Sequence, residues 1–242
     1  MQKDRLFKFP NAYGYEHLSA AVDLYHLSID TKMQPYLSGN RSHRYAIASI
    51  VQAFIGLEAV INIHGYKLLF DQNSKKFIAE DPLNIQLDFF RRSWNRTVPL
   101  IDKYRFVINQ HGLKVSPQID AKLREFIIFR NWLVHGAVYT TTLLLEELEE
   151  DIFTEHIRED SVDWKAKFPN LRFNSLDSVD STDAEKTIRI VFEAFRLILL
   201  ATKESHEILY FKQGKARIYK EDGKSNLEEL ISGTSPELKN GE

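Results

Sequence analysis

Residues 116–136 read SPQIDAKLREFIIFRNWLVHG, and this stretch decides the fold. Ser116 can cap a helix, Pro117 suits its first position, and Gly136 is the usual residue just past a helix end. We therefore predict a helix from about residue 117 to residue 135. On that helix, positions 119, 123, 126, 130 and 134 fall within roughly 80° of one another, so a single apolar stripe contains Arg130.

Apolar residues recur at spacings of three and four elsewhere in the chain, which is typical of helices. We predict further helices over residues 16–33, 42–70, 82–94, 99–109 and 182–211, the last of them opened by a capping box of Thr182 and Glu185. Residues 42–70 would form the centre of the core. The composition of residues 137–145 favours a strand or an extended segment, residues 165–180 a long loop, and residues 214–219 a short hairpin or coil.

The helical periodicity predicts an all-α helical bundle with a small irregular or β-like insertion. The chain has 242 residues, 43% of them hydrophobic, which is enough to bury one sizeable core. We expect a single domain over residues 1–220 that includes an acidic insertion at 142–181, and a disordered tail over residues 221–242. The absence of cysteine excludes a disulfide scaffold and thiolate metal sites, and fits a reducing compartment, so we expect a cytoplasmic protein without a signal peptide or membrane segment.

Charge is distributed unevenly along the chain. The formal net charge is only −2, but residues 86–130 carry nine Lys/Arg against four Asp/Glu, and residues 142–185 carry four against thirteen. Any contact with nucleic acid must therefore be local, and Arg130 lies in the basic part. The alternative interpretation is a solvated surface with uneven charge.

Arg130, Asn131 and His135 bring together groups that suit phosphodiester chemistry. An arginine can hold a phosphate through two parallel hydrogen bonds, and a histidine can transfer a proton near neutral pH. Because Arg130 lies inside an apolar stripe, it needs either a carboxylate or an anion as partner, and Glu58, on the stripe of the 42–70 helix, is the obvious carboxylate. The structural alternative is thus an ordinary core ion pair between Arg130 and Glu58.

The helical spacing does not place Arg130 and His135 on one side of the helix. Asn131 and His135 share a face, whereas His135 lies about 140° around the helix from Arg130. Two arrangements would bring the pair together: unwinding of residues 134–136, or pairing of two chains about a two-fold axis. Alternatively, His135 is a helix-terminal histidine that bonds to the last carbonyl groups.

Spacing alone is a weak signal, because the chain holds a second arginine–histidine pair at a similar spacing, Arg105 and His111, which are six residues apart. Phe106 follows Arg105, however, and His111 ends the segment in a predicted turn, so that pair lacks both the polar neighbour and the helical setting.

The segment Arg130-Asn131-x-x-x-His135 resembles the signature of the HEPN domains, which is an arginine, a polar residue and, after a short gap, a histidine. The resemblance covers most of residues 16–211, including an apolar helix with an embedded acid at Glu58. It implies a bundle of helices that acts as a homodimer. Many members are metal-independent endoribonucleases of toxin–antitoxin and antiviral systems, and others serve only as binding modules.

The resemblance also implies roles for the site residues. His135 would take the proton from a ribose 2′-hydroxyl, Arg130 would neutralise the phosphorane, and Asn131 would bond a phosphate oxygen or orient the imidazole. Bases of the RNA could stack on Trp132 or Trp94, and the backbone could follow three arginines, Arg91, Arg92 and Arg96. Core packing is the alternative for Trp94.

No other catalytic signature is present. The chain has no His-Glu-x-x-His, no glycine-rich phosphate loop and no Gly-x-Ser-x-Gly, and the scattered histidines at 17, 26, 43 and 64 lack metal-ligand spacing, so we expect neither a metal nor a cofactor. Expected partners are RNA, a second copy of the chain, and an antitoxin or another defence protein. The main rival hypothesis is a catalytically inactive HEPN-like module that binds a protein or a nucleotide.

Overall fold

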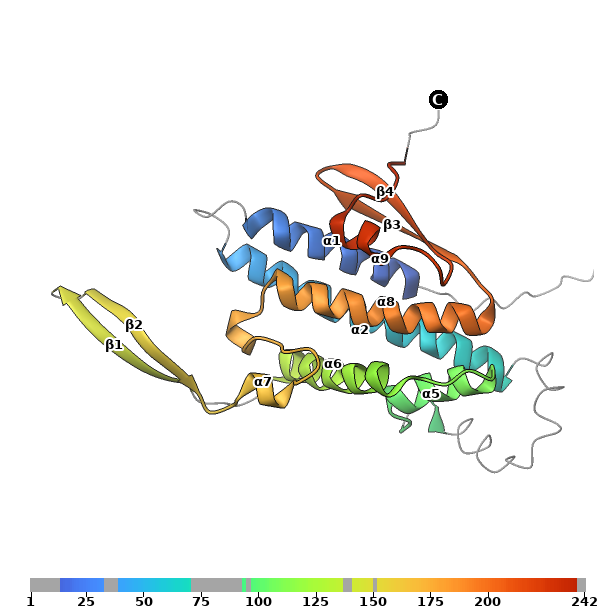
Figure 1. The fold of residues 1–242 in the computed structure, drawn as a ribbon, viewed down its shortest axis with the longest axis horizontal. Coiled ribbons are helices and arrows are strands. Elements are labelled where there is room, and N and C mark those ends of the chain that lie inside the picture. The colour runs from blue at the N-terminus through green and yellow to red at the C-terminus, as the bar shows by residue number, and fades with distance from the viewer. Residues whose placement is uncertain are drawn as a thin grey trace, which may run out of the picture.

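The computed structural model describes residues 14–32, 39–70, 93–94, 97–136, 141–149 and 152–238. Over these ranges the chain is mostly helical, with two separate two-stranded antiparallel sheets (Figure 1). The all-α prediction with a small β-like insertion is therefore confirmed at this level. The predicted helix over residues 82–94 falls outside the described residues except for Ser93 and Trp94.

Two long helices, α1 (Gly14–Lys32) and α2 (Gly39–Phe70), lie side by side along the body. Their close approach requires a glycine at position 56, because a Cβ there would lie 2.9 Å from the Leu18 side chain and 3.0 Å from the Gly14 carbonyl oxygen. By length and composition alone α2 could also cross a membrane. A core helix passes the same test, and α2 buries Ile50, Leu57 and Ile61 in the core.

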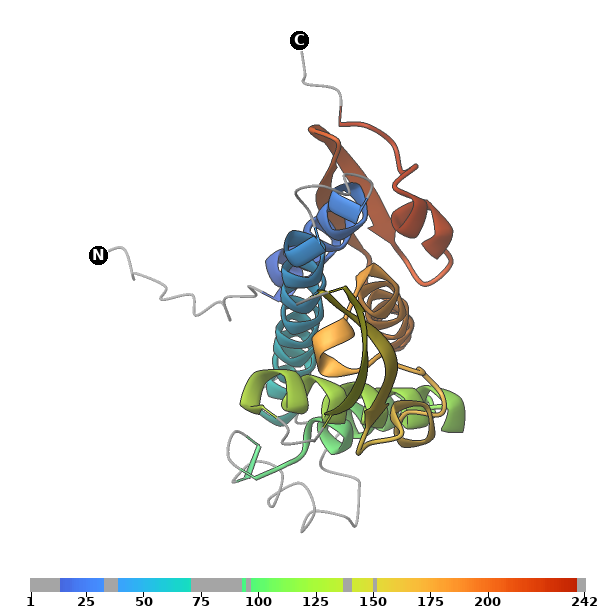
Figure 2. The same cartoon turned by 90° about the vertical axis from the view of Figure 1, so that its left-hand side faces the viewer.

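Helices α2 and α8 (Ser181–Thr202) separate the two sides of the molecule. On one side lie α1, the hairpin of β3 (His206–Lys212) and β4 (Lys215–Glu221), and the short helix α9 (Leu227–Ser232) (Figures 1 and 2). On the other side lie α5 (Leu100–Gln110), α6 (Pro117–His135) and the short helix α7 (Trp164–Lys167). The core fills the space between these layers.

Helix α6 begins and ends at the predicted residues. The Ser116 hydroxyl accepts a hydrogen bond from the Ile119 amide at 3.2 Å, and Gly136 ends α6 with a φ of 72°. The predicted 117–135 helix is therefore confirmed, because both of its signals are local caps that act wherever the helix is placed.

The acidic insertion is more ordered than the sequence indicates. Strands β1 (Thr141–Glu149) and β2 (Ile152–Asp160) pair in an antiparallel hairpin that projects away from the helices, drawn in yellow in Figure 1. The prediction of a long loop over residues 165–180 is wrong in part, because the segment holds α7 and the 3-10 turn η2 (Leu176–Ser178). Phe168 and Phe173 from this segment are buried in the core.

Helix α8 starts and stops at different residues from those predicted. The capping box consists of Asp180 and Asp183 and not of Thr182 and Glu185, because the Asp180 carboxylate accepts the Thr182 amide at 2.8 Å. The helix ends at Thr202, where Lys203 adopts a left-handed φ of 57°. The apolar residues beyond it form β3, with the buried and exposed alternation of a strand.

The prediction of a disordered tail from residue 221 is wrong for residues 221–238. Asn226 caps α9, and Leu230 is fully buried while Ile231 is 7% exposed. The Arg196 guanidinium binds both carboxylate oxygens of the buried Glu221, at 3.0 and 2.9 Å. Residues 221–238 are thus held in place by two buried apolar side chains and a buried ion pair, although their composition is mostly polar.

Candidate active site

The predicted site residues lie at the carboxyl end of a regular helix. Helix α6 continues to His135, and the Gly136 amide donates to the Trp132 carbonyl at 3.0 Å. Residues 134 and 135 are therefore not unwound, and the first of the two routes that could join Arg130 to His135 is not seen. Within one chain the two side chains leave the helix about 140° apart.

Arg130 is half-buried and lies against an aromatic ring. Its guanidinium carbon lies 4.1 Å from the centroid of the Phe54 ring of α2. Nη1 donates to the Asn131 side-chain oxygen at 3.0 Å, while the buried Nε has no hydrogen-bond partner among the described residues. A buried donor without an acceptor costs about 1–3 kcal/mol, so this guanidinium is incompletely satisfied by the protein.

The expected ion pair between Arg130 and Glu58 is not formed. Both residues are described, and no ion pair or hydrogen bond joins them. The half-buried Glu58 acts electrostatically on Lys103 of α5, whose pKa is lowered by burial and partly restored by that carboxylate. Phe54 lies one helical turn before Glu58 and takes the guanidinium in its place, so the supporting role predicted for Glu58 at Arg130 is not observed.

Asn131 and His135 are solvent-exposed on the outer side of α6. Two exposed apolar side chains accompany them on this helix, Ile128 at 40% and Val134 at 45% exposure. The Asn131 oxygen is occupied by Arg130, which differs from both roles predicted for this amide. His135 thus presents its ring to solvent, on a different side of α6 from Arg130, which Asn131 contacts.

The aromatic residues proposed to stack on RNA bases are packed within the protein. Trp132 meets the edges of Trp164 and Phe168 at centroid distances of 5.7 and 5.9 Å, and the Lys167 ammonium lies 5.3 Å from its ring. Trp94 is only 2% exposed, as its core-packing alternative requires. The three arginines predicted to follow the RNA backbone lie outside the described residues: Arg91, Arg92 and Arg96.

Sequence reasoning missed Glu125, a buried carboxylate that holds a neighbouring segment of the chain against α6. This carboxylate, 8% exposed, accepts hydrogen bonds from the backbone amides of Asn170 and Leu171, at 3.1 and 2.8 Å. It thereby fixes the segment that places Phe173 flat against Phe129, with ring centroids 3.8 Å apart. A glutamate on a helix normally indicates an exposed position, so only the fold reveals this contact.

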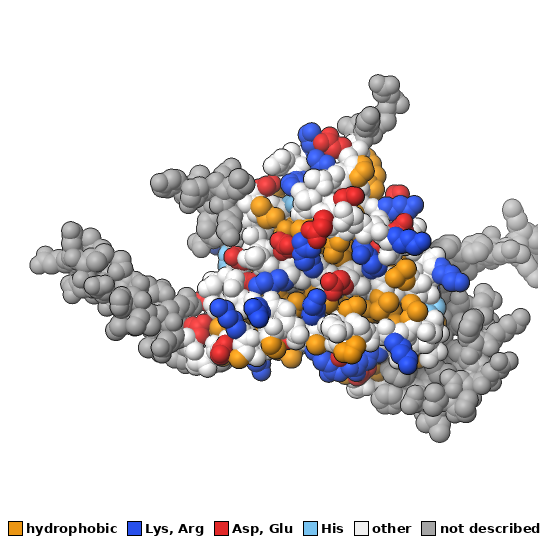
Figure 3. All heavy atoms as spheres, in the orientation of Figure 1, with side chains coloured by type: hydrophobic (Ala, Val, Ile, Leu, Met, Phe, Trp, Pro, Cys, Tyr) orange, Lys and Arg blue, Asp and Glu red, His pale blue; other side chains and the backbone are white. Residues whose placement is uncertain are grey.

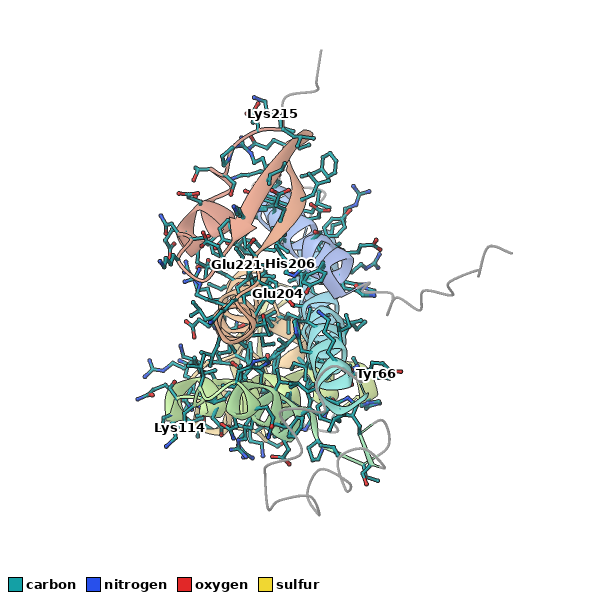
Figure 4. All side chains as sticks on the ribbon, turned by 90° about the vertical axis from the view of Figure 1, so that its right-hand side faces the viewer. Tyr66, Lys114, Glu204, His206, Lys215 and Glu221 are labelled. Atoms are coloured by element: carbon teal, nitrogen blue, oxygen red, sulfur yellow. The ribbon has the colours of Figure 1, made fainter. Side chains whose placement is uncertain are left out.

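The second arginine–histidine pair serves as an internal comparison. Asp120 takes the Arg105 guanidinium through both carboxylate oxygens, at 2.7 and 2.8 Å, and Asp102 takes Nη1 at 3.2 Å. Arg105 lines a hollow of about 630 Å³ at the start of α6 together with Lys114, which is labelled in Figure 4. Carboxylates neutralise the guanidinium of Arg105, whereas no carboxylate pairs with Arg130 among the described residues. An anion would therefore bind Arg130 more readily than Arg105.

A separate polar cluster surrounds Glu204, just after α8. One carboxylate oxygen lies 3.8 Å from His64 Nε2 and 3.5 Å from His206 Nε2, and the other accepts from Lys67 at 3.3 Å. Figure 4 shows Glu204 and His206 close together where the hairpin meets α2. Burial lowers the pKa of His64 to about 4, although Glu204 opposes the shift. The cluster joins the hairpin to α2.

The other histidines dismissed as metal ligands also link elements. His17, His26 and His43 contact Gln52, Leu230 and Val179, at distances of 2.6, 3.0 and 2.8 Å respectively. Within the part of the chain that the structure describes, no group of three His, Asp or Glu residues is arranged to hold a metal ion.

The chain was compared with family models, curated proteins and solved structures. None of the three comparisons finds a match, so the residues at the end of α6 carry the functional argument by themselves.

Proposed function

We propose that the chain is a metal-independent endoribonuclease that resembles the HEPN domains and acts as a homodimer. The observation that carries this proposal is Arg130: a half-buried guanidinium with an unpartnered Nε, five residues before the exposed His135. The carboxylates that neutralise Arg105 have no counterpart at Arg130 among the described residues. A cation in this state suits an oxyanion ligand.

The regular geometry of α6 supports a homodimer. One straight helix directs Arg130 and His135 to different sides, so a complete site needs a second chain. Exposed Ile128 and Val134 provide apolar surface beside Asn131 and His135, as a dimer interface requires. In a two-fold pair, the histidine of one chain would approach the arginine of its partner.

The proposed reaction is attack of a ribose 2′-hydroxyl on the adjacent phosphate. The 2′-oxygen–phosphorus bond forms and the phosphorus–5′-oxygen bond breaks, which leaves a 2′,3′-cyclic phosphate and a free 5′-hydroxyl. His135 of one chain takes the 2′-hydroxyl proton, and the departing 5′-oxygen takes a proton from water. General base catalysis of this kind is typically worth about 10²–10⁴-fold. Arg130 binds the phosphate oxygens, where negative charge accumulates.

RNA recognition would be local and not spread over the surface. On the face shown in Figure 3, positive and negative side chains are interspersed. Single-stranded RNA fits this pattern better than a long duplex, because a few contacts at one linkage suffice. We propose a cytoplasmic toxin or antiviral setting, in which an antitoxin or another defence protein holds the nuclease in check.

The test compares purified wild type with His135→Ala on single-stranded RNA in the presence of EDTA. Wild type should cleave and release cyclic-phosphate ends, and His135→Ala should lose at least about 100-fold in rate while keeping its thermal midpoint. The matched control is His111→Ala, because His111 is also exposed and stands six residues after Arg105. If wild type leaves RNA intact, or if both variants lose activity equally, the nuclease proposal fails and a binding module becomes the better account.

A further inference from the structure

We propose that Phe54 is a positioning residue of this site: its ring holds the Arg130 guanidinium so that the unused Nη2 is left to bind the substrate phosphate. The inference rests on the proposed function, but its physical content is the contact between α2 and α6. It assigns to α2 a role in phosphate binding that the α6 motif does not include.

The Phe54 ring is itself firmly held. Phe54 is 6% exposed, and its ring packs against the edge of Phe126 at a centroid distance of 5.9 Å and an angle of 61°. Phe126 is fully buried on α6, one turn before Arg130. The ring is therefore held in one position. Its contact with the Arg130 guanidinium, whose carbon lies 4.1 Å from the ring centroid, restrains the position of the guanidinium as well.

An aromatic face orients an arginine without consuming its donors. A carboxylate partner would occupy two N–H groups, as Asp120 does at Arg105. At Arg130 only Nη1 is used, by Asn131. Nε is buried and has no hydrogen-bond partner among the described residues, so an external ligand does not reach it. Nη2 is not buried and makes no hydrogen bond among the described residues, so its N–H groups remain to bind a phosphate oxygen.

Simple core packing explains part of this arrangement but not all of it. Phe54 would be buried against Phe126 even if residue 130 were a leucine. The unpaired charge is different, because a structural arginine would be expected to pair with a carboxylate of the protein, as Arg105 does with Asp120. The side chain as a whole stays half-exposed, so an oxyanion can approach the guanidinium from its open side.

The test uses a ligand that cannot be cleaved, so that binding and catalysis are measured separately. A short single-stranded RNA with 2′-O-methyl groups is titrated into full-length wild type, Phe54→Leu and Phe192→Leu. The ¹⁵N–¹H signal of Arg130 Nε, identified by its absence in Arg130→Lys, is recorded in each protein with and without this RNA. Phe192→Leu is the matched control, since it removes a ring of α8 that is also buried and packs against Phe195 and Tyr219.

We expect Phe54→Leu to weaken RNA binding about threefold to tenfold and to abolish the upfield ring-current shift of the Nε signal, whereas Phe192→Leu should keep the shift and bind within about twofold of wild type. The proposal is overturned if the two variants behave alike, or if wild type does not bind the methylated RNA. If wild type binds it but never cleaves unmodified RNA, the nuclease proposal fails while the role of Phe54 in positioning Arg130 stands.

Discussion

Acid should selectively weaken the contact between α1 and the carboxyl-terminal elements, because His26 is buried there in its neutral form. His26 is 1% exposed, and Nε2 donates to the Leu230 carbonyl oxygen at 3.0 Å. Burial lowers its pKa to about 4, the bond to Leu230 opposes the shift, and Lys212 and Arg217 add to it. Nδ1 has no acceptor or donor among the described residues, so a proton there would bring an unpaired charge into the core.

The magnitude follows from the difference between the folded and unfolded pKa values. The unfolded histidine binds its proton below a pKa of about 6.5 and the folded one only near 4, so the unfolded state holds more protons between these values. Stability is therefore fully present above pH 6.5 and falls by at most about 1.4 kcal/mol per pH unit below it. Between pH 7 and pH 5 this one residue should remove about 2 kcal/mol of unfolding free energy.

Urea unfolding at several pH values, for wild type and His26→Gln, measures this contribution. The variant should be less stable at pH 7, and the gap should narrow by about 2 kcal/mol at pH 5, since glutamine does not titrate. Comparing the two proteins cancels the titration of other groups, including His64. Parallel pH profiles for the two proteins would refute the assignment of His26 as a buried neutral histidine.

Two further substitutions test the packing of the core. Glu125→Gln should lower the unfolding free energy by about 1–3 kcal/mol in urea titrations. The carboxylate offers two acceptor oxygens to the backbone amides of residues 170 and 171, whereas the glutamine amide offers only one. An unchanged midpoint would show that these bonds contribute nothing to stability. Gly56→Ala should lower the free energy of unfolding by about 1–3 kcal/mol, because the added methyl group would press on Leu18 and the Gly14 carbonyl. A variant as stable as wild type in thermal unfolding would contradict the close approach of α1 and α2.

Helix α6 could be predicted because its signals are local. Ser116, Pro117 and Gly136 determine where a helix starts and stops through their own backbone and side-chain preferences, and the structure keeps all three in those positions. The α8–β3 boundary was missed for a related reason. The apolar residues from 208 to 211 continue the hydrophobic run of α8, and their alternation is too short to be distinguished from a helix before the packing is known.

The environment of Arg130 could not be predicted from the sequence, because it depends on which residue of α2 lies opposite. Phe54 and Glu58 are one turn apart on the same stripe, and a carboxylate was the more obvious partner for a buried cation. The choice between them is made by the packing of α2 on α6. The order of residues 221–238 was hidden in the same way, since two apolar residues and a buried ion pair outweigh a polar composition.

The claim that the site is shared between two chains is tested most directly by mixing two inactive variants, Arg130→Ala and His135→Ala. In a mixed pair, one site would contain an intact arginine from one chain and an intact histidine from the other. If half of the dimers are mixed and each has one such site, the mixture should recover about a quarter of the wild-type cleavage rate. A mixture as inactive as either variant alone, under conditions in which subunits are shown to exchange, would contradict the shared site.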